Sequence, residues 1–228
     1  IKMSVLDIDD RFDYNYDEIT YGSENIVSYG KDNNAPVQFK YCYMNSATLK
    51  SVIDGSVNYI IGEEVTVSDK GAIFREKVNR SGMTMKELVA KISLSYQIYG
   101  GFAIQVIYNK LGVPVEMFPL DFSKCRLNEY GDKVFYSKKN WSKYGTKSEV
   151  FDAFDVKRFD PEKPTQILYV KGDFTNNIYP LPAWFGAMKD VLSEIEASKY
   201  ALNSISNGFS ARYLINVPDG AGMDDEQK

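Results

Sequence analysis

The chain has 228 residues, of which 44% are apolar and 25% charged, and its 27 Lys and Arg against 31 Asp and Glu give a net charge of −4. This length and composition can bury a core and form one large or two small domains. The absence of histidine excludes Ser-His and Cys-His nucleophilic systems and histidine metal sites within the chain, and the acidic balance argues against a tight nucleic-acid binder.

Residues 1–40 carry the whole net charge, because they hold four basic and eight acidic residues. They are rich in Asp, Asn, Tyr and Gly and show little periodicity, which predicts an acidic arm or irregular wrap. Asp7, Asp9 and Asp10 are a conceivable site for a hard cation, but the Gly and the distant Glu of a calcium loop are missing. A solvated acidic arm is therefore the favoured interpretation.

Two helices are predicted in the following hundred residues. Residues 46–61 place aliphatic side chains on one side, and Gly62 is a typical stop. The second helix has the clearest start signal in the chain, since Thr84 and Glu87 form a capping box. Its apolar stripe ends at Gly100.

The middle of the chain is predicted to be rich in strands, which are expected at residues 102–108, 113–117, 124–128, 133–137 and 166–171. Helices and antiparallel strands are mixed without βαβ alternation. The predicted fold class is therefore α+β.

One long helix is expected over residues 182–207. Pro182 suits a first turn, and Gly208 suits the left-handed residue after a helix. At 1.5 Å per residue the helix would be about 39 Å long. Its apolar stripe consists of Leu181, Trp184, Phe185, Met188, Val191, Leu192, Ile195, Leu202 and Ile205.

Three stretches resemble the portal proteins of tailed bacteriophages. Residues 179–220, which open with Y-P-L-P and continue past N-G-F-S, are similar to the turn and long stem helix of that family. Residues 46–65 resemble its first wing helix. Residues 83–117, with Y-G-G-F-A-I-Q-V-I-Y and then V-P-V-E-M, resemble its next helix and strand pair, although Gly101-Phe102 stands where the family usually has Gly-Asn. The likeness covers residues 46–220 and rests on the order of elements.

The resemblance implies a division into domains. Residues 1–40 would be an acidic N-terminal arm, 41–178 an α+β wing domain, 179–209 the long stem helix, and 210–228 the truncated start of a clip region. A full portal subunit is longer, and the chain starts with Ile1 instead of Met. We therefore expect an N-terminal half, as a fragment or trimmed product.

The resemblance also implies a function, that of a phage or prophage portal protein, a structural subunit with no enzymatic activity and no cofactor. Such subunits assemble in the bacterial host cytoplasm into a ring, typically a dodecamer, at one capsid vertex of the virion. The ring would bind the terminase large subunit and the capsid and tail-adaptor proteins. Double-stranded DNA would pass through it weakly and without sequence specificity, and no residue is assigned to DNA contact. The stem helices would surround the channel, with one face against neighbouring copies, made of Trp184, Met188, Val191 and Ile195, and with charges on other faces, at Lys189, Asp190, Glu194 and Lys199.

Motifs for catalysis and metal binding are missing. There is no G-x-G-x-x-G, Walker A or G-x-S-x-G pattern, and no catalytic, cofactor-binding or metal residue is predicted. Cys42 and Cys125 have no second Cys nearby and are expected to be buried free thiols in a reducing cytoplasm. Glu194 and Glu196 point to different faces of the long helix and are expected to be solvated.

The sequence has no run of eighteen consecutive apolar residues and no leader. We therefore expect a soluble protein with no membrane contact and no signal peptide.

One segment interleaves basic and aromatic residues, namely Phe135, Tyr136, Lys138, Lys139, Trp141, Lys143, Tyr144 and Lys147. Exposed rings there would stack on bases, but a β-hairpin whose Lys stems cover its neighbours is favoured.

Two other functions stay open. An aromatic-rich glycan- or protein-binding module would be monomeric and would bury the long helix in its own core. A carboxylate-dependent hydrolase or nuclease would need several acids converging with a metal.

Overall fold

A computed structural model describes residues 19–22, 24–141, 147–157, 159–172 and 177–206. Two helices, α2 (Ala35–Asn45) and α3 (Ala47–Ile61), follow each other and meet at Ser46. The Ser46 hydroxyl accepts a hydrogen bond from the Leu49 N–H, 3.0 Å away, and so caps α3. As predicted, α3 ends at Gly62, which adopts a positive φ of 55°.

α5 (Met85–Tyr99) begins with the predicted capping box. The Thr84 hydroxyl accepts from the Glu87 N–H, and the Glu87 carboxylate accepts from the Thr84 N–H. The helix ends at Gly100, a left-handed residue with a φ of 80°. Strand β3 begins at the next residue, so helix and sheet are joined with almost no connecting loop.

Six strands form one sheet in the order β4-β3-β8-β7-β6-β5. Their bounds are β3 (Gly101–Tyr108), β4 (Pro114–Leu120), β5 (Cys125–Leu127), β6 (Lys133–Tyr136), β7 (Glu149–Ala153) and β8 (Thr165–Lys171). All neighbours pair antiparallel except β7 and β8, which run parallel. The smaller elements are β1 (Thr20–Tyr21), β2 (Ile26–Val27), η1 (Lys31–Asn33), η2 (Asp69–Gly71), α4 (Ile73–Glu76) and η3 (Phe122–Lys124).

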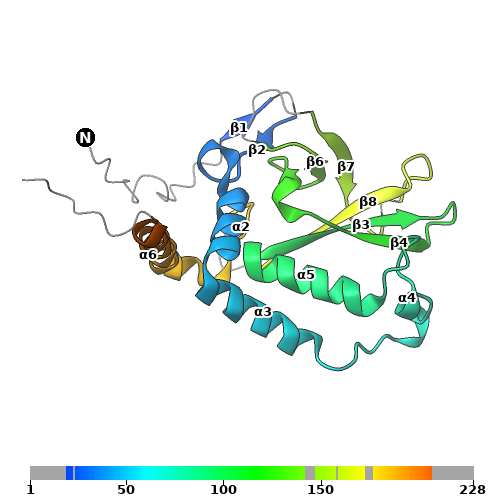
Figure 1. The fold of residues 1–228 in the computed structure, drawn as a ribbon. Helices are drawn as coiled ribbons and strands as arrows, with labels where there is room; N and C mark the ends of the chain where they lie inside the picture. Colours follow the sequence, from blue (N-terminus) through cyan, green and yellow to red (C-terminus); the bar gives the residue numbers. More distant parts are fainter. Residues whose placement is uncertain (1–18, 23, 142–146, 158, 173–176, 207–228) are drawn as a thin grey trace, which may run out of the picture.

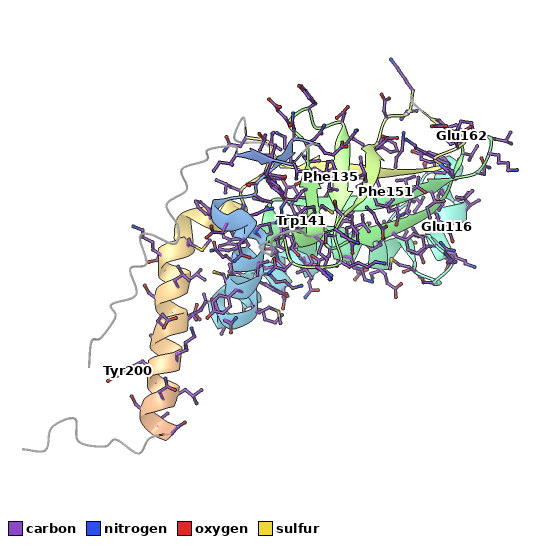
Figure 2. The ribbon with its side chains drawn as sticks, turned by 90° about the horizontal axis from the view of Figure 1, so that it is seen from above. Glu116, Phe135, Trp141, Phe151, Glu162 and Tyr200 are labelled. Carbon is purple, nitrogen blue, oxygen red and sulfur yellow. The ribbon has the colours of Figure 1, made fainter. Side chains whose placement is uncertain are left out.

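The main hydrophobic core lies between the sheet and the helices α2, α3 and α5, which gather on one side of the molecule in Figure 1. A second, smaller cluster forms around Ile104, Val106 and Tyr108 of β3. The chain then enters η4 (Ala183–Ala187) and α6 (Met188–Ser206). In Figure 2, α6 extends away from the body as one rod, at the opposite end of the molecule from Glu116 and Glu162.

The α+β class and the long C-terminal helix are confirmed, with differences in detail. Pro182 is the N-cap instead of a first-turn residue, and the first five helical residues are a 3-10 segment, in which the Phe185 N–H donates to the Pro182 carbonyl at 2.9 Å. The expected end of this helix at Asn207 and Gly208 lies outside the described residues. The same holds for residues 1–18, with Asp7, Asp9 and Asp10, and for the proposed start of the clip at 210–228.

Residues 19–40 are more ordered than the expected irregular arm. They contain the β1–β2 pair and the start of α2, and they supply Val27, Tyr29 and Phe39 to the core. Strand β7, which was not predicted, pairs antiparallel with β6, so a hairpin is present as expected. Lys138 and Lys139 are exposed, however, and do not cover their neighbours as expected.

Candidate functional site

The approach to α6 is fixed by a buried pair of tyrosines. The Tyr29 and Tyr179 rings stack with centroids 4.2 Å apart. The Tyr179 hydroxyl donates to the Val27 carbonyl at 2.7 Å and accepts from the Leu127 N–H at 2.9 Å, so it connects β2 with β5. The Tyr29 hydroxyl donates to the Pro180 carbonyl at 2.6 Å. These bonds hold the residues before α6 against the body.

Arg126 extends this cluster as a buried cation. Its side chain is fully buried and lies over the Tyr29 and Trp141 rings, with its Cζ atom 5.6 and 5.4 Å from their centroids. The guanidinium donates to the Asn33 side chain and to the carbonyls of Asn33, Ser123 and Cys125. Burial lowers its pKa from the ordinary value. The residue joins η1 to the edge of the sheet.

The first half of α6 packs on its own chain, which corrects one prediction. Met188, Val191 and Ile195 are buried in the main core, although the sequence assigned them to contacts with neighbouring copies. Trp184 is also held internally, because its indole N–H donates to the Gln97 carbonyl at 3.0 Å and its ring meets Phe39 edge-on. The stripe that the sequence placed between subunits therefore anchors the helix.

A second prediction, that Glu194 is solvated, is also corrected. Its carboxylate binds the start of α3. Its carboxylate accepts from the Ser46 hydroxyl, from the Thr48 N–H at 3.1 Å and from the Thr48 hydroxyl at 3.0 Å. These hydrogen bonds, the one from Ser46 first, lower the pKa of Glu194. Glu196 behaves differently and forms an exposed ion pair with Lys199 at 2.7 Å.

The second half of α6 projects from the body. Leu202 and Ile205 are 64% and 67% exposed, and Tyr200 lies on this far part of the rod in Figure 2. From Tyr200 to Ser206 the sequence contains no charged residue. An exposed helix normally has charged or polar residues over most of its outer surface. An uncharged, partly apolar projection is therefore the clearest candidate surface for assembly.

The basic and aromatic segment does not present its described rings for base stacking. Phe135 and Trp141 are 1% and 7% exposed, and the Trp141 indole N–H donates to the Lys124 carbonyl at 2.8 Å. Tyr136 is half-buried. Lys143 and Tyr144 lie outside the described residues. The stacking hypothesis is therefore wrong for Phe135 and Trp141.

A cleft of about 390 Å³ lies beside the parallel junction of β7 and β8 and is lined by Asp132, Asp152 and Asp155. Within the described ranges, no three Asp, Glu or Cys side chains are placed to hold a metal ion. In the same part of the chain, no helix has the length and apolar character needed to cross a membrane. Both cysteines are buried free thiols, as predicted.

No family model and no curated protein matches the chain. Chains of gene transfer agent particles share its fold. One comes from the virion of a native particle, with a TM-score of 0.62 and 15% identity over 84% of this chain. Two come from particle necks, that of an empty particle computed with C6 symmetry and that of a native particle computed with C12 symmetry. Their TM-scores are 0.61 and 0.62, at 14% and 15% identity over 90% of this chain.

The match covers 49%, 55% and 54% of those three chains, so this chain spans about half their length. At such low identity the likeness establishes the fold alone.

Proposed function

We propose that this chain is the N-terminal half of a portal protein subunit, with residues 41–178 as the wing and residues 179–209 as the stem. Copies would form a ring at one capsid vertex of a virion, typically a dodecamer, assembled in the cytoplasm of a bacterial host. The proposal is supported by the resemblance in sequence and by the fold shared with gene transfer agent chains, two of which come from necks computed with C6 and C12 symmetry.

The exposed, uncharged end of α6 is the observation that carries the proposal. Most helical stability in proteins comes from packing one face, and the far half of α6 leaves Leu202 and Ile205 exposed. Full burial of Leu202 or Ile205 would each contribute about 1.5–3 kcal/mol. No side of the segment from Tyr200 to Ser206 carries a charged residue. Contact on more than one side is therefore favourable. A helix that stands between two neighbouring copies has such contacts.

A ring explains how one projecting helix meets two different surfaces. Head-to-tail contacts between copies close into a ring when the rotation per copy divides a full turn. Each α6 would then have a neighbour on both sides, and the wings would lie further from the axis. This arrangement uses the anchored half of α6 to fix each helix and the projecting half to contact other copies.

The proposed partners follow from this placement. The ring would dock the terminase large subunit, contact capsid and tail-adaptor proteins through its wings and end, and let double-stranded DNA pass. Weak DNA contact suits a conduit, and a net charge of −4 agrees with it. The subunit would act as a structural component without catalysis or cofactor.

Neither alternative function is favoured by the site. A monomeric binding module would bury its long helix, but the end of α6 is exposed, and several of the largest aromatic side chains fill the core, namely Tyr29, Phe39, Phe122, Phe135 and Tyr179. A carboxylate-dependent hydrolase remains a proposal without a supporting constellation, since the three aspartates of the cleft are not arranged as metal ligands.

The test is the assembly state of the natural full-length protein, measured by native mass spectrometry and electron microscopy. We expect rings for the wild type and their loss in Leu202→Glu with Ile205→Glu, with an unchanged circular dichroism spectrum. The matched control is Leu111→Glu with Val113→Glu, which adds the same charge to exposed positions in the β3–β4 connection and should leave rings intact. A wild type that stays monomeric at high concentration would refute the proposal, and so would rings formed by the α6 variant.

A further inference from the structure

The direction in which the projecting half of α6 points depends on contacts near the middle of the helix, where it leaves the body. Ile195 is the last residue of α6 that is buried in the core, and nearly all residues from 196 to 206 are exposed. Eleven residues of helix extend over about 16 Å. A change of about 20° at the exit would move the far end by roughly 5 Å, which is more than half of the usual 8–10 Å spacing between packed helices.

Glu194 sits at this exit point and is bonded to a different helix. Its two carboxylate oxygens accept three hydrogen bonds from the Ser46 and Thr48 groups at the start of α3. A negative charge is favoured there, because the first N–H groups of a helix lack partners and its dipole is positive at that end. α3 has fifteen residues and packs against α5, so it gives a fixed reference inside the body.

The apolar contacts next to Glu194 hold α6 but give it little direction. Burial of Val191 and Ile195 is favourable in proportion to the area removed from water and is not directional. Cys42 and Met188 add a weak contact between sulfur atoms at 3.6 Å. Hydrogen bonds are different, because they weaken steeply when their angles change. One carboxylate oxygen of Glu194 accepts from Ser46 and the other accepts from Thr48. These bonds together define the orientation of α6 relative to α3.

We propose that Glu194 is a positioning residue that sets the angle at which α6 leaves the body, by binding the first turn of α3. The contact itself does not depend on the proposed function. Its consequence does, since a ring needs every copy to present the projecting half of α6 at the same angle. Loss of the carboxylate would leave α6 helical and attached, but would let its far half adopt a range of directions.

The experiment is a distance measurement by pulsed electron paramagnetic resonance on the chain as a monomer. Spin labels are placed at Leu202→Cys on the projecting half of α6 and at Val150→Cys on β7, both exposed positions. Cys42 and Cys125 are buried and should stay unlabelled. With Glu194 present, we expect one narrow distance distribution. Glu194→Gln should broaden or shift it, because the amide presents one acceptor instead of two charged ones.

Three further variants make the result specific. Glu196→Gln changes the same kind of group two residues away, where the carboxylate pairs with Lys199. Because the Lys199 ammonium keeps its place over the Tyr41 ring of α2, 5.4 Å from the centroid, the distribution should stay narrow. Thr48→Val should broaden it partly, and Thr48→Ser should restore it, because serine keeps both donors. A purely structural role would lower the melting temperature of Glu194→Gln without changing the distances.

The outcomes separate this proposal from the proposed function. If Glu194→Gln and Glu196→Gln give the same narrow distribution, Glu194 does not position α6, whatever the assembly state. If Glu194→Gln broadens the distribution but the wild type forms no rings, the positioning role stands and the portal proposal fails. If both hold, Glu194→Gln in the full-length protein should give fewer or irregular rings, while Glu196→Gln should assemble normally.

Discussion

The rings of Tyr29 and Tyr179 stack with their planes 6° from parallel, and both side chains are fully buried. Tyr29 precedes α2 and Tyr179 precedes η4 and α6, so the stack joins the approaches to two helices that lie side by side (Figure 1). The N-terminal part of the described chain therefore helps to hold the projecting helix. This arrangement leads to predictions about individual side chains.

Tyr179→Phe should lower the free energy of unfolding by about 1–3 kcal/mol, because it leaves the buried Leu127 N–H and Val27 carbonyl without their hydroxyl partner. The ring stack on Tyr29 would remain. Urea denaturation measures the effect. Tyr130→Phe is the control, since Tyr130 is exposed and its change should stay within about 0.5 kcal/mol. Equal stability of the two variants would show that the buried hydroxyl is not important.

Arg126→Met should destabilise the protein by at least about 3 kcal/mol. The carbonyls of Asn33, Ser123 and Cys125 would each lose a buried donor, and each orphaned group costs about 1–3 kcal/mol. Arg126→Lys should also destabilise, because an ammonium group cannot reproduce the planar fork.

The control for Arg126 is Arg80→Met, also measured in urea. Arg80 has a largely exposed side chain and forms an ion pair with Glu116 at 3.6 Å, so its loss should cost about 1 kcal/mol or less. An Arg126→Lys variant as stable as the wild type would mean that charge alone is sufficient at this position.

Stability should fall in mildly alkaline solution because of the two buried thiols. Burial raises the pKa of Cys42 to about 11 and that of Cys125 to about 12. An unfolded thiol has a pKa of about 8.5, so above this pH the unfolded state loses protons that the folded state keeps. The stabilisation is complete below about pH 8.5 and is lost as the pH rises toward the folded values.

Urea denaturation between about pH 8 and 9 checks this thiol effect, since unfolded tyrosines have a pKa of about 10 and stay almost fully protonated in that range. A Cys42→Ala variant with Cys125→Ala should show a smaller decline. If that variant does not fold, thiol reactivity provides the test: both thiols should react slowly with a disulfide reagent in the folded protein and fast in denaturant. Fast reaction of the folded wild type would contradict the prediction.

The sequence predicted those elements whose signals are local. Thr84 with Glu87, Gly62 and Gly100 mark helix ends through bonds and backbone angles made within a few residues, and all three were predicted. Helix α2 was missed because its outer positions, such as Tyr41 and Met44, are apolar like its buried ones, so no single stripe stands out. Strand β7 was missed because two of its five residues, Glu149 and Asp152, are acidic, and acidic residues are uncommon in strands.

The candidate site was predicted only in outline, because its contacts are made between distant parts of the chain. The long helix follows from its apolar period, but the period does not say whether Met188 and Ile195 face their own body or a second copy. Nothing next to Glu194 in the sequence indicates that Thr48 is its partner. Arg126 likewise lies in a short strand with no local sign of burial. A run without charges at residues 200–206 was the one available signal for the projecting surface.

The close approach of Gly100 to the start of η4 gives a final prediction about how α6 is anchored. Gly100 has a φ of 80°, and a Cβ there would overlap the backbone carbonyl of Leu181, just before Pro182. Gly131 has a similar φ of 69° but open space around it. Alanine at either position incurs the left-handed strain of about 1–2 kcal/mol.

Gly100→Ala should therefore destabilise the protein by at least about 1 kcal/mol more than Gly131→Ala, since overpacking against a backbone atom adds about 1–3 kcal/mol. The difference in unfolding free energy between the two variants isolates the contact between Gly100, at the end of α5, and Leu181, just before η4. Hydrogen exchange should rise in η4 and the first half of α6 in Gly100→Ala only, because a displaced Leu181 loosens the segment that Trp184 and Met188 hold. Equal hydrogen exchange of η4 and the first half of α6 in both variants would show that the end of α5 does not hold this segment in place.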